Sequence, residues 1–421
     1  MTSPITIVGG GITGLSAAYE LHRRGADFRL LEASSRFGGI LRTDYTSDFV
    51  IDAGPDAMLA RKPAGIELCE ELGIARRLVP SRPPRAAFIV RDGRLEPLPA
   101  DVGRAFQAAD VGRAFQARPG GPERPALPVS DESIASFFLR RFGREAVDYY
   151  ADPVLAGIHA GDVERLSIRA LFPEMADPAP ERRAADPQGI FRSFPRGMQE
   201  LVDALVAAIP RERLRLEERV APIATRTGAD WIVAVPAYAA ATLLEAVDAE
   251  LAAWCRSIPY VSSGIAVLAY PRRSVRHPLA GSGFVVPRVE RGTRILAATW
   301  LSSKWPGRAP DDVALVRAFF GGTRDPRAMT LADDELVAMA HADLARLLGI
   351  ESPPVFTRVY RWVDATPQYE VGYPEKLAAI RTRAVAHRVH LAGAGFGSIG
   401  IPDCIAAGRQ AARAALQLSP L

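Results

Sequence analysis

The sequence contains few cysteines, and they follow no regular spacing. Only three occur among 421 residues, at Cys69, Cys255 and Cys404, and none of them forms a C-x-x-C pair. An odd and sparse count argues against a disulfide framework, and the lack of paired cysteines argues against a zinc site. The composition therefore favours a reducing compartment, and we expect a cytoplasmic protein without a metal.

Long apolar runs are also missing. Hydrophobic residues make up 48% of the chain, which is enough for a sizeable core. No apolar stretch reaches, without a break, the length of about 18 residues that a membrane span requires. The most apolar stretch, 231–247, is interrupted by Pro236 and predicts a strand followed by a helix. The first residues lead almost directly into a strand-like run, so we expect no secretory signal. At most we expect peripheral membrane contact.

Lysine is nearly absent, whereas arginine is abundant. Lys62, Lys304 and Lys376 are the only lysines, so 49 of the 52 basic residues are arginine. The arginines are scattered among 48 acidic residues, and the formal net charge is only +4. Scattered charge forms no basic stripe, so the sequence predicts no nucleic-acid partner. The length alone suggests two or three domains.

The clearest motif lies within the first forty residues. An apolar run at 5–8 leads into the cluster 9–14, behind which apolar residues recur at helical spacing. A second apolar run at 28–31 ends at Glu32. This strand–helix–strand unit carries G-x-G-x-x-G, with an acidic residue roughly 20 positions further on, and the combination is typical of a dinucleotide site.

Each residue of this motif has a physical role in such a site. Gly9 permits the tight turn, Gly11 lets the backbone approach a pyrophosphate, and Gly14 lets the helix pack on the strand. Free N–H groups at the start of the helix favour the phosphates. Glu32 can accept hydrogen bonds from a ribose hydroxyl. The alternative, a glycine-rich turn that binds nothing, is disfavoured because strand, helix, strand and acidic residue occur in the right order.

The following residues indicate which dinucleotide is bound. Residues 32–43 resemble the second FAD-contacting segment of the amine oxidase-like flavoenzymes, in which a glycine pair passes under the pyrophosphate and a nearby arginine adds charge. Residues 52–57 resemble the next turn of those enzymes, which lies against the flavin. NAD-dependent dehydrogenases do not need these segments. The resemblance therefore implies FAD, which we expect to be bound non-covalently.

Further stretches narrow the resemblance to one family. Residues 152–162 and 194–201 resemble the protoporphyrinogen and coproporphyrinogen III oxidase family, and residues 401–405 resemble it more than they resemble generic amine oxidases. In that family the region near 152–162 helps to wall the substrate cavity. The helix predicted after residue 400 could point its N-terminus at the flavin, where its partial positive charge would stabilise reduced flavin. Cys404 in this helix is better interpreted as a buried small residue than as a covalent flavin link.

The resemblance places a set of FAD contacts on this chain. The predicted contacts are Gly9, Gly10, Gly11, Ile12, Thr13, Gly14, Glu32, Ala33, Arg36, Gly39, Arg42, Gly54, Pro55, Asp56, Ala57, Val220, Gly393, Ala394, Gly400 and Ile401.

Four residues are candidates for substrate binding. Arg61 and Lys62 follow the flavin turn and could meet an acidic substrate, although a solvated loop would look the same. His159 stands where most relatives have tyrosine, and Tyr373 stands where they commonly have histidine. For His159 a packing role is the favoured interpretation. Because the flavin carries the hard chemistry, we expect no side chain to act as an essential acid or base.

The implied fold class is α/β, as a mixed α+β multidomain protein with a split Rossmann-like FAD domain, an antiparallel-sheet substrate domain and a helical insertion. The implied boundaries are 1–80, 193–256 and 385–421 for the FAD domain, 81–98 and 257–384 for the substrate domain, and 99–192 for the helical insertion. Within the substrate domain the pattern predicts a hairpin at 87–95, strands at 263–268, 283–286, 295–299 and 313–320, and a helix at 336–348.

Two features depart from the family pattern. Residues 100–108 are repeated without change at 109–117, and nine residues turn a helix by two and a half turns, so the copies would face opposite sides. We interpret the repeat as a surface insertion. Only the nine residues 221–229 separate the predicted strand 215–220 from the next, where the family usually has a β-hairpin.

The resemblance implies oxidation of a porphyrinogen to a porphyrin in heme biosynthesis. The substrate would be protoporphyrinogen IX or coproporphyrinogen III, between which the sequence does not distinguish. FAD would take hydride and O2 would reoxidise it, giving H2O2, and a ferrochelatase could receive the product. Two alternatives stay open: an amine oxidase or carotenoid-type desaturase on the same fold, and a catalytically inactive flavin-binding partner protein.

Overall fold

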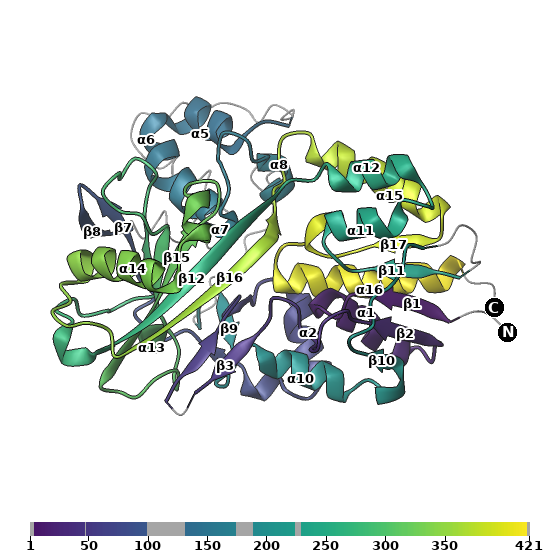
Figure 1. Ribbon diagram of the computed structural model, residues 1–421, viewed down its shortest axis with the longest axis horizontal. Coiled ribbons are helices and arrows are strands. Elements are labelled where there is room, and N and C mark those ends of the chain that lie inside the picture. The colour runs from purple at the N-terminus through teal and green to yellow at the C-terminus, as the bar shows by residue number, and fades with distance from the viewer. Residues whose placement is uncertain (1–3, 47, 99–130, 174–187, 224–228, 419–421) are drawn as a thin grey trace.

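The computed structural model describes residues 4–46, 48–98, 131–173, 188–223 and 229–418. They form two sheet-centred halves that lie side by side, with a group of short helices above the junction (Figure 1). The predicted α/β class is confirmed. The duplicated residues 100–117 lie outside the described residues, as do five of the nine residues in the shortened connection at 221–229.

The first half contains a five-stranded parallel sheet with helices on both faces. Its strands, in the order β10-β2-β1-β11-β17, are Leu214–Arg215, Phe28–Leu31, Ile5–Val8, Trp231–Val233 and Val389–Leu391. The strands are short and apolar because both faces are covered by helices. On one face pack α1, α2, α10 and α16, which span Ile12–Arg23, Pro63–Glu71, Gln199–Ala207 and Ile401–Leu418. On the other pack α11, α12 and α15, which span Ala237–Leu244, Ala249–Arg256 and Tyr373–Ala386.

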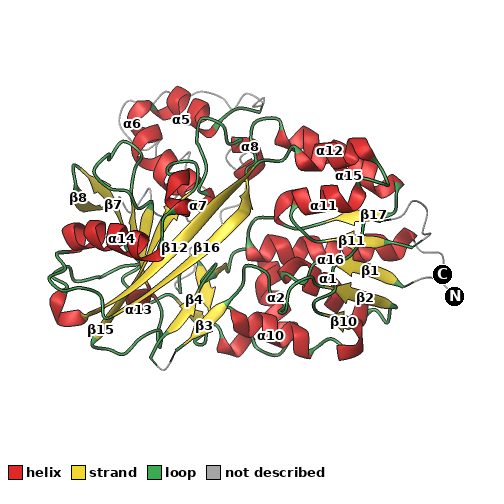
Figure 2. Ribbon diagram, in the orientation of Figure 1, coloured by secondary structure: helices red, strands yellow, loops and turns green. Residues whose placement is uncertain are grey.

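The second half is built on a seven-stranded sheet. Its strands, in the order β16-β12-β15-β14-β13-β7-β8, are Phe356–Pro367, Tyr260–Pro271, Val313–Gly321, Ala297–Trp300, Gly283–Val285, Ala87–Arg91 and Arg94–Pro97. The long strands β12 and β16 run together from the far end of this half to the junction (Figure 2). The strand pairs of this sheet are antiparallel as predicted, except that β13 and β7 pair in parallel. The strands β7 and β13 are far apart in the sequence, so no hairpin connection forces them to run antiparallel to each other.

The two faces of this sheet pack against different parts of the molecule. In β15, Val316 and Phe320 belong to the core beneath α14, which spans Asp333–Leu348. Leu315 points to the opposite face and packs with Ile51 of the first half. This alternation is the ordinary period of a strand. Arg317 has the same parity as Leu315, so the strand directs it towards the first half of the molecule.

The group of short helices above the junction has a small core of its own. It comprises α5, α6, the π-helix η2, α7 and α8, which span Ile134–Phe142, Arg144–Ala146, Val147–Ala156, Gly157–His159 and Ile168–Leu171. Ser133 and Ser167 cap α5 and α8 by accepting hydrogen bonds from backbone N–H groups in their first turns. Asp152 joins this group to the second sheet, because its carboxylate accepts a 2.9 Å hydrogen bond from the Arg288 N–H.

Smaller elements complete the junction. They are β3 and β4 at Thr43–Tyr45 and Val50–Asp52, β5, β6 and β9 at Met58–Leu59, Val79–Pro80 and Phe191–Ser193, and α13 at Leu301–Lys304. Single-turn helices lie at Ala75–Arg77, Arg211–Arg213, Arg272–Ser274, Pro326–Thr330 and Ala394–Phe396. None of the helices in the described part of the chain combines the length and apolar character needed to cross a membrane.

Several predicted boundaries shift. The predicted strand 215–220 is wrong beyond Arg215, where β10 ends, and Glu217 has a φ of 57°, which no regular strand contains. The strand predicted at 295–299 begins only at Ala297. The hairpin at 87–95 is confirmed, with Asp92 and Gly93 forming a turn in which both φ values are positive.

The domain boundaries remain a prediction. The helix α15 packs against β17 of the parallel sheet, although the sequence assigned its residues up to 384 to the substrate domain. We therefore propose to draw the last boundary before Tyr373.

Packing of α1 against α16 generates a stability prediction. A Cβ added at Gly408 would lie 2.1 Å from the Thr13 carbonyl oxygen, so neither backbone could keep its place. Although alanine is the better helix former, Gly408→Ala should lower the free energy of unfolding by about 1–3 kcal/mol, the usual penalty of overpacking. Gln410→Ala, at an exposed position of the same helix, should change it by less than about 0.5 kcal/mol. Urea unfolding measures both, and a stabilised Gly408→Ala protein would contradict the packing.

Candidate cofactor and substrate site

The glycine cluster forms a turn that only glycine can complete at two positions. Gly9 has a φ of +105°, and a Cβ there would lie 2.5 Å from the Ala234 carbonyl oxygen. A Cβ at Gly14 would lie 1.9 Å from the Gly9 carbonyl oxygen. These two glycines therefore have the structural roles that the sequence predicts, tight turning and close packing of α1.

Gly11 differs because it faces open space. A Cβ built on it meets no atom within 4 Å. Gly11 is also the N-cap of α1, and no side chain caps the N–H groups of that first turn. A cradle of free N–H groups at a helix N-terminus suits an anionic group such as a pyrophosphate. The residues present thus fit a dinucleotide at the position that the sequence predicts.

Glu32 closes the side of this cradle. Its carboxylate accepts hydrogen bonds from the Gly10 N–H at 2.6 Å and the Ser34 N–H at 2.8 Å, which fix it beside the turn. Each carboxylate oxygen keeps a second acceptor position. A ribose hydroxyl could use it, in agreement with the predicted role of Glu32 and the adjacent Ala33.

The predicted second FAD segment lies against the same turn. Arg36 donates 3.2 Å hydrogen bonds to the carbonyl oxygens of Phe37 and Leu41 and also bonds Gly39. Arg42 donates a 2.8 Å hydrogen bond to Asp44. Both arginines brace the protein itself. Their contact with FAD, like that of Val220 on the loop after β10, remains a prediction.

The C-terminal glycine turn meets the first helix. A Cβ on Gly393 would lie 3.4 Å from Thr13 Oγ1, so the predicted contacts near 12–13 and 393–394 share one region. Tyr369 donates a hydrogen bond to the Ala394 carbonyl, and Tyr373 donates one of 3.0 Å to the Gly395 carbonyl. The two tyrosine rings stack with centroids 4.0 Å apart. Tyr373 therefore braces the turn that leads to α16, which suggests a positioning role more than the predicted substrate contact.

The first turn of α16 contains two further side chains of interest. Cys404 is buried, its thiol donates to the Ser398 carbonyl, and burial raises its pKa to about 11. A protonated, engaged thiol is a poor nucleophile, which supports non-covalent FAD. Asp403 pairs with Lys62, whose Nζ lies 2.6 Å from Oδ2, and their side chains are 32% and 41% exposed.

The Lys62–Asp403 pair changes what is expected of Lys62. The sequence predicts that Arg61 or Lys62 meets an acidic substrate, and the structure places Lys62 beside the N-terminus of α16. Its partner there is a carboxylate of the protein. A substrate carboxylate would have to share Lys62 with Asp403 or take the place of Asp403. Both side chains of the pair are partly exposed to solvent, so a substrate could reach Lys62.

A buried group of charged side chains surrounds the predicted flavin turn at 52–57. We call it the turn cluster, and its members are Asp52, Asp56, Lys304, Arg308 and Arg317. Arg308 contacts Asp52 at 2.9 Å, and both side chains are only 1% exposed. Lys304 Nζ lies 2.9 Å from Asp56 Oδ2. The cluster joins residues of the first half to α13, β15 and the loop between them.

Arg317 is the member that reaches the turn's backbone. Its Nη1 donates to the carbonyl oxygens of Asp52 at 3.0 Å and Gly54 at 2.8 Å, while its Nη2 lies 3.4 Å from Asp56 Oδ1. Trp305 Nε1 adds a 2.9 Å hydrogen bond to Asp56. These contacts hold Gly54, Pro55, Asp56 and Ala57 against the second sheet.

Sequence reasoning missed three members of the turn cluster, Lys304, Arg308 and Arg317. Two signals were available. Lys304 is one of only three lysines, and Arg317 interrupts an otherwise apolar strand at 313–320. A charged side chain inside such a strand is unfavourable unless an oppositely charged or hydrogen-bonding group lies on the same face of the sheet.

His159 is buried, with 7% of its surface exposed. Its Nδ1 has no hydrogen-bond partner within the described ranges, and its ring meets Phe172 edge-on. Burial lowers the pKa of His159 to about 4, so the imidazole is neutral at physiological pH. The Gln368 amide donates a 3.1 Å hydrogen bond to the His159 carbonyl oxygen. These surroundings fit the packing role that the sequence favours.

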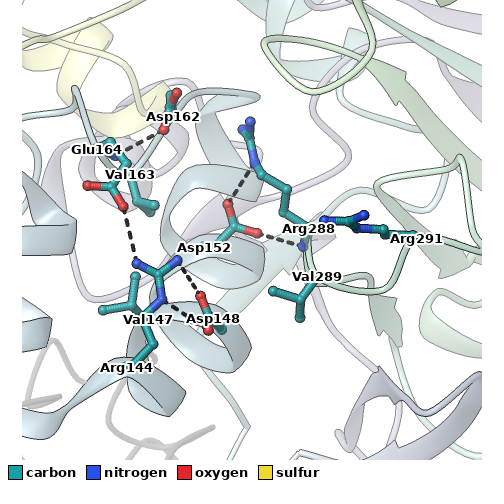
Figure 3. Close-up of a pocket in the computed structure, with 10 residues that line it drawn as sticks. All are labelled: Arg144, Val147, Asp148, Asp152, Asp162, Val163, Glu164, Arg288, Val289 and Arg291. Atoms are coloured by element: carbon teal, nitrogen blue, oxygen red, sulfur yellow. Dashed lines mark hydrogen bonds and ion pairs between the residues drawn. The ribbon is translucent and has the colours of Figure 1, made fainter.

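A cavity of about 420 Å³ lies between the short helices and the β13–β14 connection (Figure 3). Most of the charged side chains that line this cavity form ion pairs with one another. Arg144 lies 2.8 Å from Asp148, and Arg288 lies 3.5 Å from Asp152. A smaller cavity shares Asp152 and Arg288 and reaches Gly157 and Gly161. The stretch 152–162, predicted to wall a cavity, does line these two. None of the four predicted substrate residues lines either of them.

Comparison with known sequences gives a consistent result. The profile of the family described as flavin containing amine oxidoreductase matches residues 12–416. A coproporphyrinogen III oxidase of Bacillus subtilis (strain 168) is 29% identical over 462 residues, with 98% of this chain and 97% of that protein covered. Another, of Mycobacterium leprae (strain TN), is 33% identical over 449 residues, with 97% of each covered. Protoporphyrinogen oxidase 2, chloroplastic/mitochondrial, of Arabidopsis thaliana is 27% identical over 437 residues, with coverage of 89% and 86%.

Solved structures extend the comparison. A crystal structure from Exiguobacterium sp. 255-15 superposes with a TM-score of 0.85 at 27% identity and covers 99% of both chains. Cyclohexylamine oxidase from Brevibacterium oxydans IH-35A superposes with a TM-score of 0.73 at 18% identity and covers 99% of this chain and 100% of its own. The second likeness concerns the fold alone.

The cradle generates a prediction about cofactor affinity. Gly11→Val should fold normally, because its side chain enters open space, but should lose FAD, because it fills the place of the pyrophosphate. Glu32→Ala should weaken FAD binding ten- to a hundredfold, since a charge-assisted hydrogen bond contributes roughly 1.5–3 kcal/mol. Titration of apoprotein with FAD, followed by flavin fluorescence, measures both. Normal FAD content in a folded Gly11→Val protein would show that the phosphate site lies elsewhere.

Buried His159 generates a prediction about pH. Its folded pKa lies below the unfolded value, so the unfolded chain takes up the proton first and stability falls as pH falls. Between pH 7.5 and 5.5 wild type should lose about 1.4 kcal/mol more than His159→Phe. The exposed His22→Gln is the control for the loss of a histidine as such. Urea unfolding at both pH values measures the difference, and equal losses in wild type and His159→Phe would show that the imidazole is solvated.

Proposed function

The chain belongs to the flavin-containing amine oxidoreductase family, and from this premise we propose that it is an FAD-dependent porphyrinogen oxidase of heme biosynthesis. The observation that carries the proposal is the similarity to coproporphyrinogen III oxidases over 96% or more of the chain. It spans the FAD segments and the region 152–162 alike, so it is not a likeness of the dinucleotide fold alone.

Bound FAD would supply the redox chemistry, accepting two electrons with one proton from the macrocycle in each of three successive oxidations and passing them on. The residues of the chain bind FAD and orient it. The turn at Gly11 and the N-terminus of α1 hold the phosphates, and Glu32 holds the ribose. The first turn of α16 places partial positive charge near the predicted flavin contacts Gly400 and Ile401. No side chain is needed as an essential acid or base.

Coproporphyrinogen III is the substrate that we favour. The relatives at 32–33% identity bear that enzyme name, whereas the plant protoporphyrinogen oxidase is 27% identical and is matched over less of its length. Either porphyrinogen carries propionate carboxylates, which an apolar cavity cannot hold without cationic partners. As further parts of the proposal, O2 is the acceptor, H2O2 the second product and a ferrochelatase the enzyme class that receives the porphyrin. We place the reaction in the cytoplasm, with at most peripheral membrane contact.

Aerobic assay of the purified holoprotein on both porphyrinogens tests the proposal. Porphyrin fluorescence should rise with coproporphyrinogen III and more slowly with protoporphyrinogen IX, with H2O2 formed in parallel. The folded Gly11→Val protein without FAD is the matched control and should show only spontaneous oxidation. Putrescine and cyclohexylamine test the amine oxidase alternative. A yellow protein that oxidises neither porphyrinogen faster than this control would contradict the proposal.

The propionates generate a prediction at Arg61 and Lys62. Replacing both with alanine should raise KM by roughly fivefold, the effect of about 1 kcal/mol for a partly exposed ion pair, while kcat changes less. Carboxylates distant from the reacting carbon contribute uniform binding, which appears in KM. The effect should shrink at high salt. Arg76→Ala with Arg77→Ala, in the single-turn helix Ala75–Arg77 that follows α2, removes the same charge and should leave KM unchanged. A wild-type KM in the first double variant would place the carboxylates elsewhere.

A further inference from the structure

The turn cluster carries an excess of positive charge. Three cations, Lys304, Arg308 and Arg317, surround two carboxylates, Asp52 and Asp56, and the five side chains are between 1% and 12% exposed. With both carboxylates ionised, one positive charge in this buried region therefore has no counterpart within the cluster.

The net charge of the turn cluster stays positive whichever of the two carboxylates is ionised. Burial alone would raise the pKa of Asp56, but the charges of Lys304 and Arg317 outweigh it and hold the pKa below its usual value. Burial raises the pKa of Asp52, and the charge of Arg308 offsets this only in part. If Asp52 takes up a proton, the excess of positive charge grows.

Arg317 is the least neutralised cation at the turn itself. Among the described residues its only carboxylate contact is with Asp56 at 3.4 Å, and Asp56 is shared with Lys304 at the shorter distance of 2.9 Å. The Arg317 Nε is buried, with no hydrogen-bond partner among the residues that the structure describes. Its other donors point at the carbonyl groups of Asp52 and Gly54.

An unbalanced buried cation is unfavourable for the protein alone. The strand pattern of β15 nevertheless directs Arg317 to this face of the sheet, beside the turn predicted to lie against the flavin. Such an arrangement becomes favourable when negative charge develops on the other side of that turn. Charge placed in advance where negative charge will form needs no rearrangement during reaction.

We propose that Arg317 is a positioning residue whose charge, acting across the turn at Gly54, favours the reduced form of bound FAD. The inference rests on the proposed function, in which the cofactor accepts two electrons and one proton from the substrate and so gains one negative charge. The second proton lost by the substrate leaves to solvent. O2 then takes two electrons and two protons to become H2O2, and the cofactor returns to its oxidised form.

Redox titration of the holoprotein under anaerobic conditions, with a reference dye, tests the inference. Arg317→Met should shift the equilibrium towards oxidised cofactor at least tenfold, which is about 30 mV for a two-electron couple. Arg317→Lys, which keeps the charge, should shift it less. The matched control is Arg361→Met, because Arg361 of β16 bonds Asp333 and Leu331 below the opposite face of the sheet. This control removes the same charge and should leave the potential within twofold of wild type.

A merely structural Arg317 would change thermal stability or FAD content but not the potential of the FAD that remains bound. An unchanged potential in Arg317→Met, or an equal shift in Arg361→Met, would overturn the inference. If Arg317→Met holds no FAD, Lys304→Met decides by the same criteria, since it also removes the excess charge. The titration requires only bound FAD, so failure of the inference is distinguishable from failure of wild type to oxidise porphyrinogens.

Discussion

The fold depends on a buried electrostatic contact between its two halves. The turn at 52–57 belongs to the first half, yet its backbone and carboxylates are held by Arg317, Lys304, Trp305 and Arg308 of the second. A charged group is costly to bury unpaired, so removal of Asp52 or Asp56 would leave further buried cations uncompensated. Such a contact fixes one relative position of the halves, because small displacements would break several hydrogen bonds together. A site that needs residues from both sheets therefore has a defined geometry.

The same constraint connects the ends of the chain. Met58 and Leu59 follow the turn and contact α16, and Lys62 pairs with Asp403 in its first turn. The glycine turn that leads to α16 is braced in turn by Tyr369 and Tyr373. Three predicted FAD segments, far apart in sequence, are thereby held around one region. Packing alone is non-directional, whereas these hydrogen bonds and ion pairs specify which backbone atoms face the region of the predicted FAD contacts.

The first part of the candidate cofactor site and one hairpin of the second sheet could be predicted from local sequence. The unit from 5 to 32 and the hairpin at 87–95 are specified by glycine placement and short-range periodicity, and both occur where predicted. The family resemblance is confirmed by the profile match and the relatives. What the sequence did not reveal depends on long-range contacts. The parallel pairing of β7 with β13, the role of Tyr373 and the charge partners of Arg317 each join residues at least 22 positions apart. Local patterns contain no information about such partners.

The central claim is that electrons pass from a porphyrinogen to FAD bound between the two halves of this chain. It is tested most directly by mixing the purified yellow protein with coproporphyrinogen III without O2 while recording the absorbance of flavin and porphyrin together. Because conversion of a porphyrinogen to a porphyrin releases six electrons, three flavins should bleach for each porphyrin formed when the protein is in excess. The flavin absorbance should return when O2 is admitted. Porphyrin formation with the flavin still oxidised, or flavin that stays yellow with no porphyrin formed, would contradict the claim.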